Sequence, residues 1–240
     1  MSRQTPVLRL TDGLRFRAGP STWSLEPRRL QRGEWVAFVP AGEEPTVDPA
    51  GPLARALITL AEPLRGTVEI LGREVYRMDY VERQLLRAQV GFVQGYGGLL
   101  SNRTLRNNLA LPLSVHGGLS REEERRRIED TLYGFALESV AGLHPHEVDG
   151  ATRWRTCVAR SLVLEPVWVV LEGIGDWEMD RGRGVTWSRL REYRERGRSA
   201  AAICLSRQNP AFEAWFEEQG GAVVPYFPLV DEPEPRSFSP

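Results

Sequence analysis

The chain has 240 residues, of which 41% are hydrophobic and 26% are charged, and its formal net charge is −1. This length and apolar content are sufficient for one domain with a sizeable core, and they exclude a disordered segment. A charge this close to zero also excludes a general attraction to nucleic acid or to anionic lipid.

The first half of the chain predicts strands with two helices between them. Alternating apolar and polar residues indicate strands at 7–10 and 14–19, and the apolar run WVAFV at 35–39 indicates a buried strand. Apolar residues at helical spacing, with a proline near the start, predict a helix over 52–62. The other elements expected here are a strand and turn at 66–75, a short helix at 80–89 and a core strand at 90–94.

The second half begins with helices and returns to strands. Residues 105–140 are predicted to be helical, with Ser120 as an N-cap and Glu123 at the spacing of a capping box. The charged run REEERRR in this segment indicates a solvated helix face. The later elements are a continuous apolar strand at 167–173, a helix at 187–196, a buried strand at 199–206 and a proline-rich tail from 229. This order predicts an α/β domain that carries a helical subdomain.

The residue types in the sequence limit the kinds of functional site that the chain can contain. All 31 basic residues are arginines, because the sequence contains no lysine. Cys157 and Cys204 lie far apart in apolar stretches, which predicts buried side chains and no metal or redox pair. No stretch approaches the roughly 18 apolar residues of a membrane span, and the first residues lack the apolar part of a signal peptide. We therefore expect a cytoplasmic protein.

Residues 33–52, GEWVAFVPAGEEPTVDPAGP, resemble a phosphate-binding loop in position but not in chemistry. Such a loop needs glycines for the phosphates, a lysine for the β/γ oxygens and a hydroxyl for magnesium. Here the turn carries Glu43, Glu44 and Asp48, and no lysine follows. Because like charges repel, the loop is predicted to be a surface turn without a ligand. The alternative is a rearranged loop that binds an anion through Arg55 or Arg65.

Two longer stretches resemble a known family. VGFVQGYGGLLSNRTLRNNLALPL (90–113) is similar to the Q-loop region of ABC-transporter ATP-binding subunits, and HPHEVDGATRWRTCVARSLVLEPVWVVLEG (144–173) is similar to their signature helix and Walker B strand. The resemblance covers about residues 7–225, and the wording GGLLSNRTL is closest to Mla-type lipid transporters. It implies an α/β fold with an ABC-type P-loop NTPase-like core and a β-rich N-terminal part. The expected boundaries are a domain over 1–225, a helical subdomain at roughly 97–160 and a tail over 226–240.

The resemblance also implies which positions would act on ATP, and these carry other residues. The family's Walker B strand ends in an aspartate for magnesium and a glutamate as base, positions that fall on Glu172 and Gly173. A glycine cannot accept a proton, and help from a general base is typically worth about 10²–10⁴ in rate. Shifting the alignment by one residue places Glu172 at the position of the base, but it places Leu171 at the position of the metal ligand. The family's switch histidine falls on Arg207, which is a permanent cation.

Two more positions of the family motifs differ. Gln94 lies one place before the family's glutamine, whose position falls on Gly95. In the signature, VDGAT replaces an LSGGQ-like motif, so that Asp149 stands in place of the serine that would donate to the γ-phosphate, and Gly150 follows it. Asp149 remains a good N-cap for its helix, but its charge is wrong for a triphosphate.

These differences predict a catalytically inactive pseudo-ATPase: not an enzyme, with no ATP or magnesium as cofactor and no metal site. Two alternatives remain open. One is a weak ATPase that uses Glu172 and an unconventional loop, and the other is a free-standing regulatory protein that uses the fold as an interaction surface.

The predicted partners also follow from the resemblance. In the family, a groove beside the Q-loop receives a helix of the membrane permease, and the residues expected to line it here are Tyr96, Leu99, Leu100, Leu105 and Leu109. For each leucine the alternative is the internal core. We expect a structural or regulatory subunit of a transporter, peripheral to the inner face of the cell membrane, and the wording GGLLSNRTL points to lipid as the cargo. A second nucleotide-binding subunit is the other partner, and the apolar stretch 222–230 is expected to help this pairing.

Overall fold

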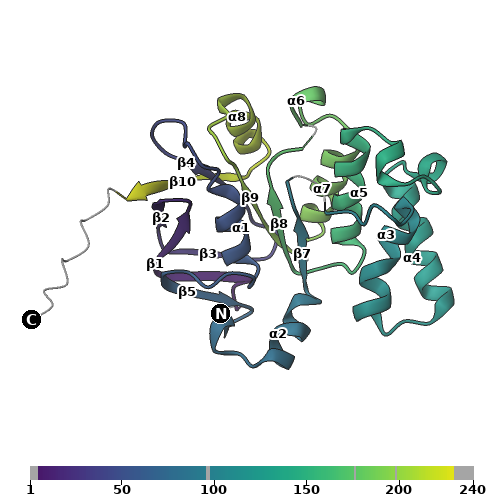
Figure 1. Cartoon of the computed structure of the whole chain (residues 1–240), viewed down its shortest axis with the longest axis horizontal. Coiled ribbons are helices and arrows are strands. Elements are labelled where there is room, and N and C mark those ends of the chain that lie inside the picture. The colour runs from purple at the N-terminus through teal and green to yellow at the C-terminus, as the bar shows by residue number, and fades with distance from the viewer. Residues whose placement is uncertain (1–4, 96–97, 176, 198, 230–240) are drawn as a thin grey trace, which may run out of the picture.

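The computed structural model describes residues 5–95, 98–175, 177–197 and 199–229. Ten strands form one sheet in the order β6-β5-β1-β2-β10-β4-β9-β8-β7, with β3 paired to β1 (Figure 1). The strands are β1 (Leu8–Ala18), β2 (Ser21–Leu25), β3 (Arg28–Leu30), β4 (Trp35–Pro40), β5 (Arg65–Ile70), β6 (Arg73–Glu74), β7 (Val90–Val93), β8 (Trp168–Glu172), β9 (Ala200–Cys204) and β10 (Ala222–Leu229).

Helices connect the strands at most of the expected places. They are α1 (Ala50–Leu57), α2 (Tyr80–Arg87), α3 (Leu105–Pro112), α4 (Arg121–Gly134), α5 (Gly150–Leu162), α6 (Trp177–Asp180), α7 (Val185–Glu195) and α8 (Pro210–Glu218). The helix predicted over 52–62 ends early, because Thr59 adopts φ 73°, a left-handed conformation that no α-helix continues through. In the described part of the chain, no helix is long and apolar enough to cross a bilayer.

The strands β4, β7, β8 and β9 run parallel, and three of them are buried along their whole length. Their side chains alternate between two apolar clusters. In β8, Trp168 and Val170 face the cluster that includes α1, whereas Val169 and Leu171 face the cluster that includes α5, α7 and α8. A strand covered on both faces has no polar side, which explains the continuous apolar runs in the sequence.

The strand β10 joins the parallel and antiparallel parts of the sheet. Residues 222–226 pair with β4, and residues 227–229 pair with β2. Tyr226 is fully buried, and its hydroxyl donates to the Leu205 carbonyl at 2.6 Å. The predicted boundary at 225 is therefore wrong, since residues 226–229 belong to the sheet. The stretch expected to be free for pairing with a second subunit is committed to a strand as far as Leu229.

Between β7 and β8 the chain forms the helices α3, α4 and α5, which we call the helical insertion. As predicted, Ser120 caps α4 by accepting from the Glu123 amide at 3.2 Å. The charged face of α4 is solvated, with Arg126 paired to Glu123 and Asp130 at 2.8 Å. Cys157 and Cys204 are both buried, as the sequence indicated.

Candidate functional site

The carboxyl ends of the parallel strands meet at one edge of the sheet, where ligands bind in open α/β folds. The loop over 41–49 follows β4, Gln94 and Gly95 follow β7, Glu172 ends β8 and Arg207 follows β9. The structure thus gathers most of the predicted nucleotide positions at this edge. Asp149 and Gly150 instead lie at the start of α5, within the helical insertion.

The amino-terminal end of α1 is occupied by the chain's own carboxylates. Asp48 Oδ1 accepts from the Ala50 amide at 2.9 Å, so this amino-terminal amide of the helix is already satisfied. A Cβ added to Gly51 would lie only 3.1 Å from Glu172 Oε1 and 3.2 Å from Arg55 Nη1. The side chains of Glu172 and Arg55 therefore lie against α1 at Gly51, where the absence of a side chain leaves room for them.

Glu172 is a buried carboxyl with one unsatisfied oxygen. Its side chain is only 7% exposed, and within the described ranges its Oε2 has no hydrogen-bond partner. Burial raises the pKa of Glu172, and the charge of Asp48 raises it further, whereas the Gly95 amide and Arg55 lower it. The expected glutamine position thus supplies a backbone amide to this carboxyl, and a Cβ on Gly95 would lie 3.1 Å from the Glu172 carbonyl oxygen.

A cavity of about 420 Å³ lies beside the loop, between residues 40–45 and 207–210. Glu43, Glu44 and Arg207 line it, so the charges at this wall have opposite signs. Gln208 holds the loop in place, because its Nε2 donates to the Pro40 carbonyl at 3.2 Å and to the Gly42 carbonyl at 3.4 Å. Sequence reasoning missed Gln208, whose role depends on a contact across the sheet.

Two of the predicted positions have clear local roles. Gly173 has φ 86°, a conformation that favours glycine, and its amide donates to the Cys204 carbonyl at 2.9 Å. Asp149 caps α5 by accepting from the Thr152 amide at 2.6 Å, and this hydrogen bond lowers its pKa. The carboxylate predicted at the signature is therefore used by its own helix.

The structure corrects the predicted permease-docking residues. Leu105 and Leu109 are fully buried, because they lie four residues apart on the inward face of α3, and they do not line a surface. Leu99 is partly buried against the core, whereas Leu100 is 44% exposed. Tyr96 lies outside the described residues. The buried Asn108, missed from the sequence, fixes this loop by bonding to the Leu100 amide at 2.8 Å and to its carbonyl at 3.1 Å.

A second cavity, of about 310 Å³, lies between β7 and the helical insertion. We call it the insertion cavity, and its walls include Arg87, Phe92, Leu111, Val115, Arg160 and Leu164. Val115 is 69% exposed at this position. Besides Arg87, α2 carries Tyr80, Val81 and Leu85, whose side chains are exposed to solvent. The sequence of α2, YVERQLLR, contains several apolar residues, of which only Leu86 is buried. The excess of apolar residues could have indicated exposed apolar side chains on this helix.

The residues at the sheet edge fit magnesium better than phosphate. Glu172 and Asp48 are oxygen donors of the kind that magnesium accepts. A phosphate at the start of α1 does not fit the arrangement described, because Asp48 already uses the Ala50 amide and no lysine is present. In the described residues, no group of three or more His, Cys, Asp or Glu side chains could hold a metal.

Comparison with known proteins gives relatives over about half of the chain. It is 35% identical over 114 residues to the "Methionine import ATP-binding protein MetN" of Cereibacter sphaeroides, covering 48% of this chain and 32% of the relative. It is 32% identical over 133 residues to the protein of the same name from Thermobifida fusca, covering 53% of this chain and 41% of the relative. The chain thus spans about a third to two fifths of the length of these relatives. No family model matches the sequence.

Solved structures show the same fold over nearly the whole chain. The "Dimeric Structure of MJ0796, a Bacterial ABC Transporter Cassette" matches with a TM-score of 0.73 at 21% identity, covering 92% of this chain and 94% of that one. MJ0796 "bound to ADP and Pi" matches with a TM-score of 0.67 at 22% identity, covering 82% and 87% of the two chains. The α/β fold is therefore that of ABC ATP-binding cassettes, and the predicted resemblance to ABC ATP-binding subunits is confirmed.

The comparisons contradict two predictions. The chain was expected to be no enzyme and to use neither ATP nor magnesium, but its relatives are named methionine import ATP-binding proteins. The predictions assumed that nucleotide chemistry requires particular side chains at the family's motif positions. A set of missing side chains does not show that no other group serves the nucleotide.

Proposed function

We propose that this protein is an ATP-binding subunit of an ABC transporter and binds a membrane-embedded permease through the insertion cavity. The observation that carries the proposal is this cavity itself, which lies between the sheet and the helical insertion and is lined by partly exposed apolar side chains and the exposed Val115. In this proposal the protein lies at the inner face of the cell membrane, with a second nucleotide-binding subunit beside it. The dimeric cassette among the structural neighbours supports that pairing.

The insertion cavity has the features of a helix-binding groove. Apolar side chains from both walls can contact one face of a helix, and Val115 provides exposed apolar surface in its lining. Two arginines keep the frame rigid: Arg87 Nε donates to Thr59 Oγ1 at 3.2 Å, and Arg160 Nη1 donates to the Gly98 carbonyl at 2.7 Å. A groove with fixed walls loses little conformational entropy when a helix binds.

Permease binding is tested with the permease encoded beside this chain, reconstituted in lipid nanodiscs. Val115→Asp is expected to weaken binding at least tenfold, because it places an unpaired carboxylate in an apolar contact. The matched control is Tyr133→Asp on α4, a side chain that is 74% exposed and does not line the cavity. Equal binding by wild type and Val115→Asp, or equal loss in both variants, would contradict the proposed docking site.

ATP binding is tested through the charge of the loop. Because Glu43 and Glu44 face the loop cavity, Glu43→Gln with Glu44→Gln is expected to tighten Mg-ATP binding by about three- to tenfold. The control, Glu122→Gln with Glu124→Gln on α4, changes the net charge equally but lies in another element. Calorimetric titration with Mg-ATP measures both. Absence of binding in every protein, or equal tightening in the control, would count against nucleotide binding at this edge.

In this proposal the permease, and not this chain, determines which cargo is transported. The predicted lipid cargo rests on the stretch GGLLSNRTL, whereas the relatives are methionine import proteins by name. The insertion cavity and the sheet edge serve either cargo in the same way, because both act on the permease and the nucleotide.

A further inference from the structure

A cavity of about 440 Å³ lies in the antiparallel part of the sheet, where β1 changes its partner strand. β1 pairs with β3 as far as Leu10 and Arg28, and it pairs with β2 from Leu14 and Leu25 onward. Between these ladders, the described residues 11–13 and 26–27 do not pair with each other, which leaves a gap in the sheet. We call the opening the arginine cavity, and its walls include Arg9, Thr11, Asp12, Pro27, Arg28 and Arg29.

The walls of the arginine cavity are positively charged. Arg9 of β1 and Arg29 of β3 are directly opposite each other in the strand pairing, so their side chains leave the sheet on the same face. Arg28 borders the cavity as well, because it is the last residue of β3 to pair with β1 before the gap. Among the described lining residues, Asp12 is the one carboxylate, so three guanidinium groups face a single negative charge. Like charges directly opposite each other destabilise a sheet, which favours an anion between them.

Two of these arginines hold a buried nitrogen that no protein group satisfies. In the described part of the chain, the Nε atoms of Arg9 and Arg28 are buried and have no hydrogen-bond partner. Arg9 Nη1 contacts Glu69 Oε2 at 3.4 Å, which is long for a charged pair, and Arg28 has no side-chain partner in any described range. Leaving a buried donor of a charged group unpaired is costly, so these nitrogens indicate a ligand that accepts hydrogen bonds.

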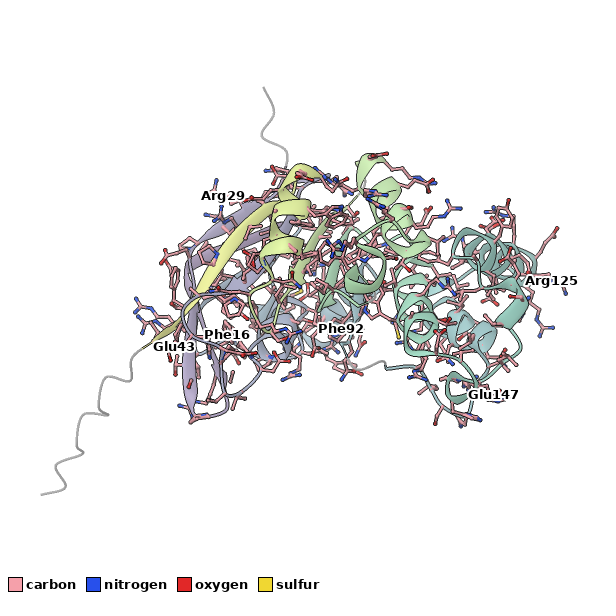
Figure 2. The ribbon with its side chains drawn as sticks, turned by 90° about the horizontal axis from the view of Figure 1, so that it is seen from above. Phe16, Arg29, Glu43, Phe92, Arg125 and Glu147 are labelled. Atoms are coloured by element: carbon pink, nitrogen blue, oxygen red, sulfur yellow. The ribbon has the colours of Figure 1, made fainter. Side chains whose placement is uncertain are left out.

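Buried unpaired nitrogens distinguish the arginine cavity from the other arginines of this sheet. Arg15 and Arg65 are also directly opposite each other, but both are exposed, and as described neither lines the cavity nor holds such a nitrogen. Exposed donors bond to water and need no ligand. The described walls of the arginine cavity share no residue with those of the insertion cavity or the loop cavity. Figure 2 shows Arg29 away from Arg125 of the helical insertion and from Glu43 of the loop.

We propose that the arginine cavity binds a phosphomonoester, the phosphate group of either a soluble metabolite or a lipid headgroup. A phosphomonoester carries a charge of about −1.5 to −2 at pH 7, which matches the charge of three arginines and one aspartate on the walls. A carboxylate would leave half of that charge unbalanced. Planar guanidinium groups donate two parallel hydrogen bonds to phosphate oxygens, and the Thr11 hydroxyl can donate another. Pro27 gives apolar surface to the carbon part of the ester.

Nuclear magnetic resonance of the arginine Nε–H groups tests this site directly, with methyl phosphate as the probe. The Nε signals of Arg9 and Arg28 are expected to shift and saturate together, with a dissociation constant below about 5 mM. Each signal is assigned by its loss in Arg9→Lys or Arg28→Lys. Acetate should bind at least fivefold more weakly than methyl phosphate, because it carries one charge and one fewer oxygen pair to accept from the guanidinium groups.

Three variants measure what each charge contributes, with circular dichroism confirming that they fold. Arg28→Gln is expected to weaken methyl phosphate binding at least tenfold, because it removes a guanidinium group and its buried Nε. Asp12→Asn should tighten binding at least threefold, since it removes the opposing charge. The matched control is Arg15→Gln, which removes an equal charge from the same strand outside the cavity and should change binding less than twofold.

Cosedimentation with phosphatidylcholine vesicles that contain phosphatidic acid separates the two sources of the phosphate. Saturation by methyl phosphate without vesicle binding supports a soluble ester, and vesicle binding that Arg28→Gln weakens but Arg15→Gln does not supports a headgroup. The proposal would be overturned if neither Nε signal shifted with methyl phosphate and the vesicles did not bind. Equal weakening in Arg28→Gln and Arg15→Gln, or equal binding of acetate and methyl phosphate, would overturn it as well.

Discussion

Val170→Asp is expected to leave the chain unfolded at 25 °C. Val170 is fully buried in β8, between β7 and β9, and faces the apolar cluster that includes α1. An unpaired carboxylate in such a place costs several kcal/mol, in addition to the packing lost with the valine. The free energy of unfolding of a domain is only about 5–15 kcal/mol, so one buried charge removes most of it. Far-ultraviolet circular dichroism and thermal melting measure the loss.

Val115→Asp is the matched control, because it makes the same chemical change at a side chain that is 69% exposed. It should melt within a few degrees of wild type. A cooperative melt of Val170→Asp near the wild-type temperature would contradict the position of β8 at the centre of the sheet. Gly173→Glu is expected to destabilise the fold far less than Val170→Asp. Open space surrounds the position, but φ 86° makes a side chain there strained by about 1–2 kcal/mol.

The sequence predicted the elements whose pattern is local. β8 and β9 appear as continuous apolar runs because helices cover both faces, and Ser120 and Asp149 appear as caps because capping needs only three neighbouring residues. The helix α8 was missed although Asn209 caps it by accepting from the Phe212 amide at 3.0 Å and Pro210 follows. That start signal is local too, and it was available in the sequence.

The strand β10 was missed for a physical reason. Pro225 and Pro228 argue against an inner strand, since proline cannot donate to a ladder. The structure avoids this conflict by dividing the strand: residues 222–226 pair with β4, and residues 227–229 pair with β2. Each part thus pairs on one side only, like an edge strand, and edge strands accommodate proline.

The candidate site was predicted only in part, because some of its features follow from the strand order and others depend on contacts between distant residues. Glu172, Gly173 and Arg207 could be placed at the sheet edge because parallel strands carry their ends there. The hydrogen bond from Gln208 to the loop and the burial of Leu105 and Leu109 depend on tertiary packing, which residue spacing does not show. The docking prediction was wrong for Leu105 and Leu109, because leucines at positions i and i+4 describe one face of α3 without saying whether that face points inward.

Deletion of residues 222–240 is expected to abolish the cooperative fold, whereas deletion of residues 230–240 should preserve it. The longer deletion removes the strand that joins β2 to β4, and with it the buried side chains of Val224 and Tyr226. Loss of a large buried side chain typically costs about 3–5 kcal/mol, and the unpaired edges of both sheet parts add to this.

The two deletions separate a structural role of β10 from a role in pairing. If residues 222–229 served only to bind a second subunit, the longer deletion would give a folded monomer with a sharp thermal transition. The structure predicts instead a protein with no cooperative transition and rapid proteolysis, because the Leu205 carbonyl loses the Tyr226 hydroxyl and the cores beneath β2 and β4 are opened to water. Light scattering on the shorter deletion then measures pairing in a chain that still folds. Its circular dichroism spectrum should match that of wild type, since β10 remains complete through Leu229.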